Sequence, residues 1–221
     1  NYLAQDRADI RSACKEIARF MQTPTAIAID MLKKLGRYLA GKPRVARRFF
    51  QQPWTGRIIV QVDSDFAGCP VTRKSTTVTA TFNGHHNLDF TSNLQATEAL
   101  SSGEAEVYAS VKGTSSGLGT VSIFADMGLT VSLELEADAT AGKGIVQRLG
   151  AGRLKHMETQ YLWIQRVFYI KRATIRKIPR ADNASDLGTH ACTAGEIDDH
   201  MRTLGYVTLA GYSKLALKAA L

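Results

Sequence analysis

The segment "RIIVQVDSDFAG", residues 57–68, begins as a strand and ends in a turn that carries two acids. Its first half is apolar and β-branched, which favours an extended strand, and the Asp and Gly residues that follow favour a turn. Asp63 and Asp65 are two residues apart, so a strand presents both carboxylates on one face. Two such charges repel each other unless a positive group lies between them. Acid-rich turns are also common after strands that bind nothing, so the rest of the chain must decide between the two interpretations.

The chain on either side of this segment predicts a mixed α/β fold. Helical periodicity and capping residues predict an N-terminal helical hairpin over residues 1–41. Alternating or apolar runs predict strands at 57–63, 74–84, 86–92, 130–138 and 173–180, and the intervening patterns predict helices at 101–128, 139–150 and 156–172 and a last helix that opens near Asn183. Glycines inside 101–128 weaken that helix and allow a kink. Three antiparallel strands followed by alternating helices and strands predict a mixed five-stranded sheet flanked by helices.

The bulk composition restricts the class of protein. The chain has 221 residues, of which 44% are hydrophobic, and no apolar run approaches the roughly 20 residues of a membrane helix, so we expect a globular protein that does not interact with a membrane. Three widely spaced cysteines suggest neither a disulfide framework nor a zinc site, and favour a reducing, intracellular compartment. The net charge of +8 favours a polyanionic partner such as nucleic acid. The first residue is not Met, so we expect a piece of a longer protein.

Acids recur where the predicted strands end and where the helices begin. Asp63 and Asp138 each end an apolar strand, Glu104 and Glu106 lie in the first turn of the helix at 101–128, and Asp186 lies in the first turn of the last helix. Such ends converge on one edge of an open α/β sheet. Acids at helix starts also oppose the helix dipole, which accounts for three of these residues individually but not for an acid after both apolar strands. Clustered carboxylates are ligands for Mg²⁺ or Mn²⁺.

Several motifs resemble, in order, the ribonuclease H domain of copia-type LTR retrotransposon polymerases: "VDSDFAGCPVTRKSTT", "ALSSGEAEVYA", "EADATAGKGIV", "RLKHMETQYLWIQ" and "ASDLGTH". The preceding "NYLAQDRADIRSACKEIARFMQTPT" and "MLKKLGRYLAG" resemble the end of the reverse transcriptase and its connection segment. The resemblance covers about residues 1–190. It implies a ribonuclease H-like domain at 57–204, after a helical connection segment at 1–56 and before a C-terminal extension at 205–221.

The resemblance also implies an activity and a set of site residues. The family hydrolyses the RNA strand of RNA–DNA hybrids with two divalent ions, Mg²⁺ or Mn²⁺, held by four acids. By motif, these acids match Asp63, Glu106, Asp138 and Asp186, and Glu106 matches better than Glu104 because "VYAS" follows it. The positive group between Asp63 and its neighbours would then be a metal ion, with Asp65 favoured as a solvated turn acid. Ala139, Leu94 and the pair Thr189–His190 depart from the family pattern and affect substrate contacts more than metal binding.

Basic residues supply candidate contacts to nucleic-acid phosphates. The segment "KPRVARRFF" crowds cations and aromatics together, and further cations flank the acid motifs; the candidates are Arg44, Arg47, Arg48, Arg73, Lys74, Lys155 and His156. The expected partner is an RNA–DNA hybrid or another nucleic acid, within a longer polyprotein or a larger assembly. A second interpretation remains open: a non-catalytic nucleic-acid-binding or structural subunit derived from such a retrotransposon domain.

Overall fold

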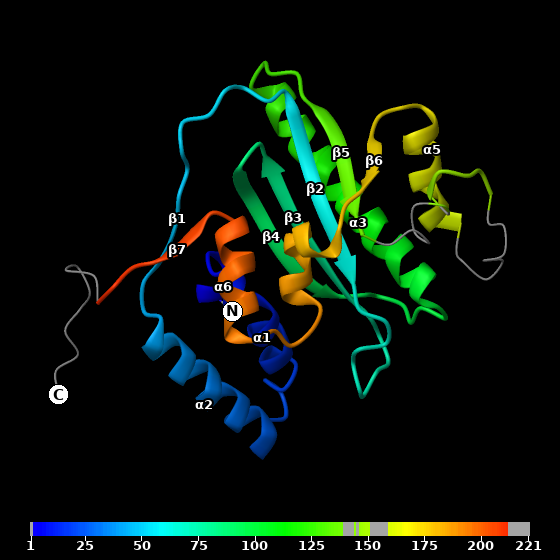
Figure 1. The fold of residues 1–221 in the computed structure, drawn as a ribbon. Helices are drawn as coiled ribbons and strands as arrows, with labels where there is room; N and C mark the ends of the chain where they lie inside the picture. Colours follow the sequence, from blue (N-terminus) through cyan, green and yellow to red (C-terminus); the bar gives the residue numbers. More distant parts are fainter. Residues whose placement is uncertain (1, 139–143, 145, 151–158, 212–221) are drawn as a thin grey trace.

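The computed structural model describes residues 2–138, 144, 146–150 and 159–211, which form a mixed five-stranded sheet with helices on its faces (Figure 1). The strand order is β4-β3-β2-β5-β6, and the strands are β2 (Arg57–Ser64), β3 (Thr76–Asn83), β4 (His86–Leu94), β5 (Ser132–Ala137) and β6 (Thr174–Lys177). Neighbours among β2, β3 and β4 are antiparallel, whereas β5 is parallel to β2 and β6 is parallel to β5. The sheet predicted from the sequence is therefore confirmed.

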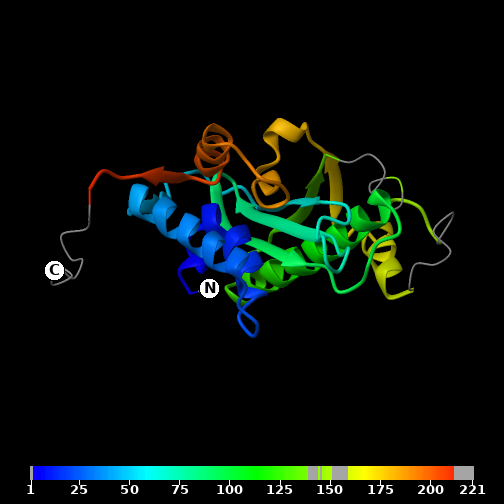
Figure 2. The ribbon, with the colours of Figure 1, turned by 90° about the horizontal axis from the view of Figure 1, so that it is seen from below.

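Helices cover both faces of this sheet (Figure 2). On one face, α3 (Ser102–Asp126) and α5 (Trp163–Tyr169) pack against alternate side chains of β2 and β5, such as Val60 and Leu135. On the other face, α1 (Ala8–Ala18), α6 (Ala194–Thr203) and the 3-10 turn η4 (Ala184–Gly188) pack on β3 and β4. The predicted N-terminal hairpin is formed by α1 and α2 (Ala26–Gly41), after the short η1 (Leu3–Gln5). No helix in the described part of the chain is both long and apolar enough to cross a membrane.

Two segments differ from the sequence-based expectation, and a third lies largely outside the described residues. The helix expected at 156–172 is shorter: η2 (Thr159–Leu162) precedes α5. The last helix does not open at Asn183, because η3 (Arg180–Asp182) and η4 are short 3-10 turns and α6 begins only at Ala194. Asn183 nevertheless caps η4, and its side chain accepts a hydrogen bond from the Ser185 amide. The helix expected at 139–150 lies largely outside the described residues, and Lys155 and His156 lie outside them altogether.

Two glycines of α3 serve close packing, and the helix runs uninterrupted for 25 residues. Gly113 and Gly117 are one helical turn apart and both face the sheet. A Cβ atom at Gly117 would lie 2.5 Å from Leu133 Cδ1 and 2.9 Å from Val60 Cγ2. Only a residue without a side chain allows the helix to approach β2 and β5 this closely.

Alanine at two glycines of α3 should therefore change stability in opposite directions. We expect Gly117→Ala to lower the free energy of unfolding by about 1–2 kcal/mol, because overpacking outweighs the gain in helix propensity. The same change at Gly119, where a Cβ would meet no atom within 4 Å, should raise it by about 1 kcal/mol. Urea unfolding of the two variants measures both effects. Equal shifts for the two would contradict the close packing of α3.

A second, two-stranded sheet joins the beginning and the end of the described chain. β1 (Val45–Arg47) pairs antiparallel with β7 (Tyr206–Thr208), and Val45 lies opposite Thr208. The Arg48 amide extends this ladder by donating to the Gly205 carbonyl at 2.9 Å. Through β1 and β7, the expected connection segment and the described part of the expected extension are thus in direct contact, on one side of the five-stranded sheet (Figure 1).

Candidate active site

The four acids predicted from the sequence line one cavity of about 360 Å³. Asp63 lies near the end of β2, Asp138 directly follows β5, Glu106 lies in the second turn of α3, and Asp186 lies in η4. Asp65, Ser64, Arg180, Thr189 and His190 complete the lining. The four acids, which are up to 123 positions apart in the sequence, therefore meet at the carboxyl ends of two parallel strands.

The parallel pairing of β2 and β5 brings the first two acids together. Val62 lies opposite Ala137 in this ladder, so the next residues, Asp63 and Asp138, leave the two strands side by side. Adjacent parallel strands are about 4.8 Å apart. The register of the central strands is thus sufficient to place two carboxylates at one edge of the sheet.

A polar clamp holds the fourth acid beside them. The fully buried Asn183 donates its amide to the Val62 carbonyl at 3.1 Å, and the Ala184 amide donates to Gln61 Oε1 at 2.8 Å. These two bonds fix η4 on β2 and so place Asp186 next to Asp63. The sequence analysis missed Gln61, although an amide inside an apolar strand was a signal that could have identified it.

Burial and mutual repulsion dominate the electrostatics of the cavity. Burial, together with the charges of Asp63 and Asp138, raises the pKa of Glu106 to about 8. Glu106 Oε2 is buried and accepts no hydrogen bond from the part of the chain that the structure describes. Burial also raises the pKa of Asp63, which the hydrogen bond from Thr189 to Oδ2, at 2.6 Å, partly offsets. Repulsion among the clustered acids therefore destabilises the metal-free fold, and a bound cation would reduce this repulsion.

Two nearby acids have other contacts. Glu104 is buried and accepts hydrogen bonds from the Tyr108 hydroxyl and from the Leu100 amide, so it fixes the start of α3. Asp65 Oδ1 accepts a hydrogen bond of 2.5 Å from the Thr76 amide, which supports its interpretation as a turn residue. Glu104 therefore does not line the cavity, whereas Asp65 lines it but is held by the Thr76 amide.

The donor set of the cavity suits a hard divalent cation. Carboxylate oxygens are the ligands that Mg²⁺ and Mn²⁺ prefer, and the unpartnered Glu106 Oε2 offers one such oxygen. As the side chains stand, however, no three His, Cys, Asp or Glu residues within the described ranges are arranged to hold a metal ion. Asp186 pairs with Arg180 at 3.1 Å and approaches His190 at 3.5 Å. A cation would have to take the place of these donors.

The candidate phosphate-binding residues that the structure describes lie outside this cavity. Arg73 is exposed in the loop between β2 and β3, and the Lys74 ammonium donates to the Ala96 carbonyl. Arg44 donates to the Ala210 carbonyl, and Arg47 donates to the Asn87 and Leu88 carbonyls. The guanidinium of Arg48 instead lies 4.9 Å from the centre of the Phe50 ring.

Comparisons with known proteins agree with the resemblance in the sequence. No protein-family model matches the chain. Two curated relatives from Arabidopsis thaliana, the retrovirus-related Pol polyproteins from transposons RE1 and RE2, are each 34% identical over 132 residues, or 59% of this chain. The chain spans only 9% of the length of each. Among solved structures, LC11-RNase H1, isolated from compost by a metagenomic approach, aligns with a TM-score of 0.43 and 17% identity over 60% of this chain and 91% of its own. The identity to the two Pol polyproteins confirms the resemblance to retrotransposon polymerases.

Proposed function

We propose that the chain is a ribonuclease H that hydrolyses the RNA strand of RNA–DNA hybrids with divalent metal ions. The observation that carries this proposal is the meeting of Asp63, Glu106, Asp138 and Asp186 in one cavity. These are the four positions at which the sequence matches the retrotransposon motif. Similarity to the Pol polyproteins from transposons RE1 and RE2 supports the same assignment, and a longer polyprotein as its context.

Each acid would have a defined part in this site. Asp63 and Asp138 would hold the metal ions from neighbouring strands, and Glu106 and Asp186 would complete the ligand set from α3 and η4. Two Mg²⁺ or Mn²⁺ ions, when bound, activate a water molecule and stabilise the leaving oxygen of a phosphodiester. Thr189 holds Asp63 Oδ2 in place by a hydrogen bond. Selection of RNA would rest on contacts to the 2′-hydroxyl beside the cleaved bond.

Basic residues around the site would bind the nucleic-acid backbone. Arg180 lines the acidic cavity and its side chain is 65% exposed, so it can turn from Asp186 towards a phosphate. Arg73 and Lys74, together with Arg44, Arg47 and Arg48, remain candidates for further contacts, as do Lys155 and His156. Each such contact would contribute a salt-dependent share of the affinity.

One observation favours a second candidate, a non-catalytic subunit that binds nucleic acid. Thr189 and Arg180 already engage Asp63 and Asp186, and no metal-holding group of three is arranged within the described ranges. A protein that no longer binds metal ions could keep these contacts and still bind a hybrid through its basic surface.

Cleavage of a hybrid separates the two functions. We expect the purified chain to cut the labelled RNA strand of an RNA–DNA hybrid in millimolar Mg²⁺ or Mn²⁺, and to leave single-stranded RNA and duplex DNA of the same sequence intact. A chelator should stop the reaction without releasing the hybrid. Binding of the hybrid without cleavage in either metal would exclude the enzyme and favour the binding subunit.

A further inference from the structure

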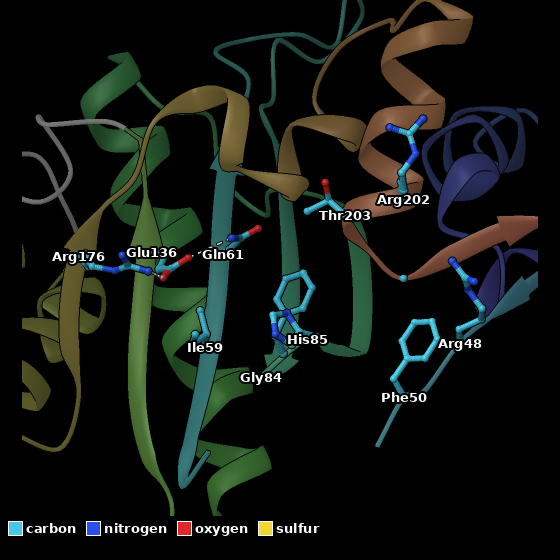
Figure 3. A pocket seen from close by; sticks show the side chains of 12 residues that line it. Arg48, Phe50, Ile59, Gln61, Gly84, His85, Glu136, Arg176, Arg202 and Thr203 are labelled. Atoms are coloured by element: carbon cyan, nitrogen blue, oxygen red, sulfur yellow. Dashed lines mark hydrogen bonds and ion pairs between the residues drawn. The ribbon is translucent and has the colours of Figure 1, made fainter. Parts of the chain in front are cut away.

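A second cavity, of about 540 Å³, lies on the same face of β2 as Asp63 (Figure 3). Side chains alternate along a strand, so Ile59 and Gln61, which line this cavity, point to the same side as Asp63. Helix α6 and η4 cover this face over β3 and the carboxyl end of β2, whereas over the rest of β2, and over β5 and β6, the cavity remains open. Its other wall comes from the residues that follow β1 and precede β7. The η3–η4 segment separates it from the acidic cavity.

Arg48 presents its guanidinium to this cavity without a polar partner. It forms no hydrogen bond and no ion pair through its side chain with the residues that the structure describes, and it is exposed. Its main chain is nonetheless fixed, because the amide donates to the Gly205 carbonyl. The neighbouring Arg47 differs, since protein carbonyls already occupy its guanidinium. Arg48 is thus a positioned cation whose charge is available to an anion.

Aromatic side chains accompany this cation on the surface. Phe50 lines the cavity below Arg48 and is 58% exposed, and Phe49 and Trp54 in the same segment are 58% and 54% exposed. Exposing three large aromatic rings within six residues leaves apolar surface in water. A ring of this kind offers a flat face on which a nucleobase can stack, and an adjacent Arg adds a contact to the phosphate.

Two further arginines border the cavity. Arg202 pairs with Asp199, and both side chains are exposed, so this guanidinium can turn to a phosphate at small cost. Arg176 pairs with Glu134 and with the buried Glu136, and these contacts hold it in place as a cation at the cavity wall. Of the twelve lining residues only Glu136 is acidic, and Gln61 also holds it through a hydrogen bond. The lining therefore has the opposite charge to the acidic cavity.

We propose that this cavity binds a single-stranded segment of nucleic acid, with a base stacked on Phe50 and the adjoining phosphate on Arg48. The basic lining favours a polyanion over a peptide that carries few acidic residues. The exposed rings favour unpaired bases over a duplex, because the bases of a duplex are not free to stack on protein side chains. The site is distinct from the hydrolytic one and does not depend on cleavage. A protein partner is the competing occupant, and the experiment below distinguishes it.

Fluorescence anisotropy with a labelled oligothymidylate of about 12 nucleotides, in a chelator and at several salt concentrations, tests the site. Arg48→Ala should weaken binding by about 5- to 20-fold and reduce the salt slope by about 0.7 log units, the value for one phosphate of a single strand. Phe50→Ala should weaken binding to a similar extent with an unchanged slope, and Phe50→Tyr should retain wild-type binding because it keeps the ring.

Two exposed residues elsewhere serve as matched controls, namely Arg37 in α2 and Tyr169 in α5. Arg37→Ala removes a guanidinium and Tyr169→Ala removes an aromatic ring from other surfaces of the protein. Both variants should bind the oligonucleotide as the wild type does. Wild-type affinity in Arg48→Ala and Phe50→Ala, or equal losses in the controls, would overturn the proposal and leave the surface to a protein partner. Because no metal is present, the result is independent of whether the chain cleaves hybrids.

Discussion

Replacing Asp138 with Asn is expected to slow cleavage of an RNA–DNA hybrid by at least about 1,000-fold in Mg²⁺, a loss of about 4 kcal/mol in transition-state stabilisation. The substitution removes a charged oxygen ligand but keeps the size of the side chain. Asp138 lies next to Asp63 and raises the pKa of both Asp63 and Glu106 by repulsion. Loss of its charge should therefore leave the metal-free fold as stable as before, or more so. Single-turnover cleavage and thermal unfolding in a chelator measure the two effects.

Asp65 supplies the matched control for this experiment. It lines the same cavity, yet its Oδ1 accepts a hydrogen bond from the Thr76 amide, and Asn offers the same acceptor. Asp65→Asn should therefore retain cleavage within a few-fold of the wild type. Equal activity of Asp138→Asn and the wild type would show that the acids have been assigned the wrong role. Equal loss in both variants would point to the charge of the cavity as a whole.

Without metal, the protein should lose stability as the pH rises from about 5 to 8, and Glu106 should account for most of the loss. Its pKa rises from 4.5, the ordinary value, to about 8 in the fold. The folded state thus holds a proton that the unfolded chain releases, so stability is complete below pH 4.5 and declines until the pH passes 8. The shift corresponds to at most about 5 kcal/mol. For a chain of this length we expect the melting temperature to fall by about 5–10 °C.

Glu106→Gln should remove this pH dependence and weaken the stabilisation by metal. In a chelator at pH 8, the variant should have a higher melting temperature than the wild type, whereas at pH 5 the two melting temperatures should be close. Millimolar Mg²⁺ should restore the wild type at pH 8, because a cation bound only to the folded state stabilises it by about 3 kcal/mol at 100 times its dissociation constant. The variant should respond much less.

The exposed Glu98 provides the control for a lost carboxylate. Glu98→Gln should follow the wild type at both pH values and in Mg²⁺. If the difference in melting temperature between the wild type and Glu106→Gln were the same at pH 5 and pH 8, the proton would not reside on Glu106. A wild type that gains nothing from Mg²⁺ would argue against a metal site that forms with the fold.

The edge of the sheet that carries the acids was predictable, because it depends on local patterns. Apolar runs ending at Asp63 and Asp138 mark two strands, and parallel pairing then places their ends together. Residues that act across long separations were not predictable in this way. The bonds from Asn183 and Ala184 to β2 join residues more than 120 positions apart, and nothing in either local sequence specifies the partner.

The glycines of α3 show how a propensity can indicate the wrong role. Taken alone, Gly113 and Gly117 weaken a helix, and only the position of the sheet reveals that their missing side chains admit Val60, Val62 and Leu133. The two arginines at the end of β1 show the same for charge. Arg47 and Arg48 are identical neighbours, yet only the tertiary structure shows that carbonyls occupy the first and that the second is available.

The pairing of β1 with β7 also determines how the protein would respond to mechanical load. Val45 and Thr208 lie at the same end of the ladder, and the chain leaves both strands there, towards α2 on one side and residue 209 on the other. Tension between these two segments would peel the ladder apart one residue pair at a time, which needs much less force than sliding whole strands past each other. The β1–β7 ladder would yield first, before the five-stranded sheet and the acids at its edge carried the load.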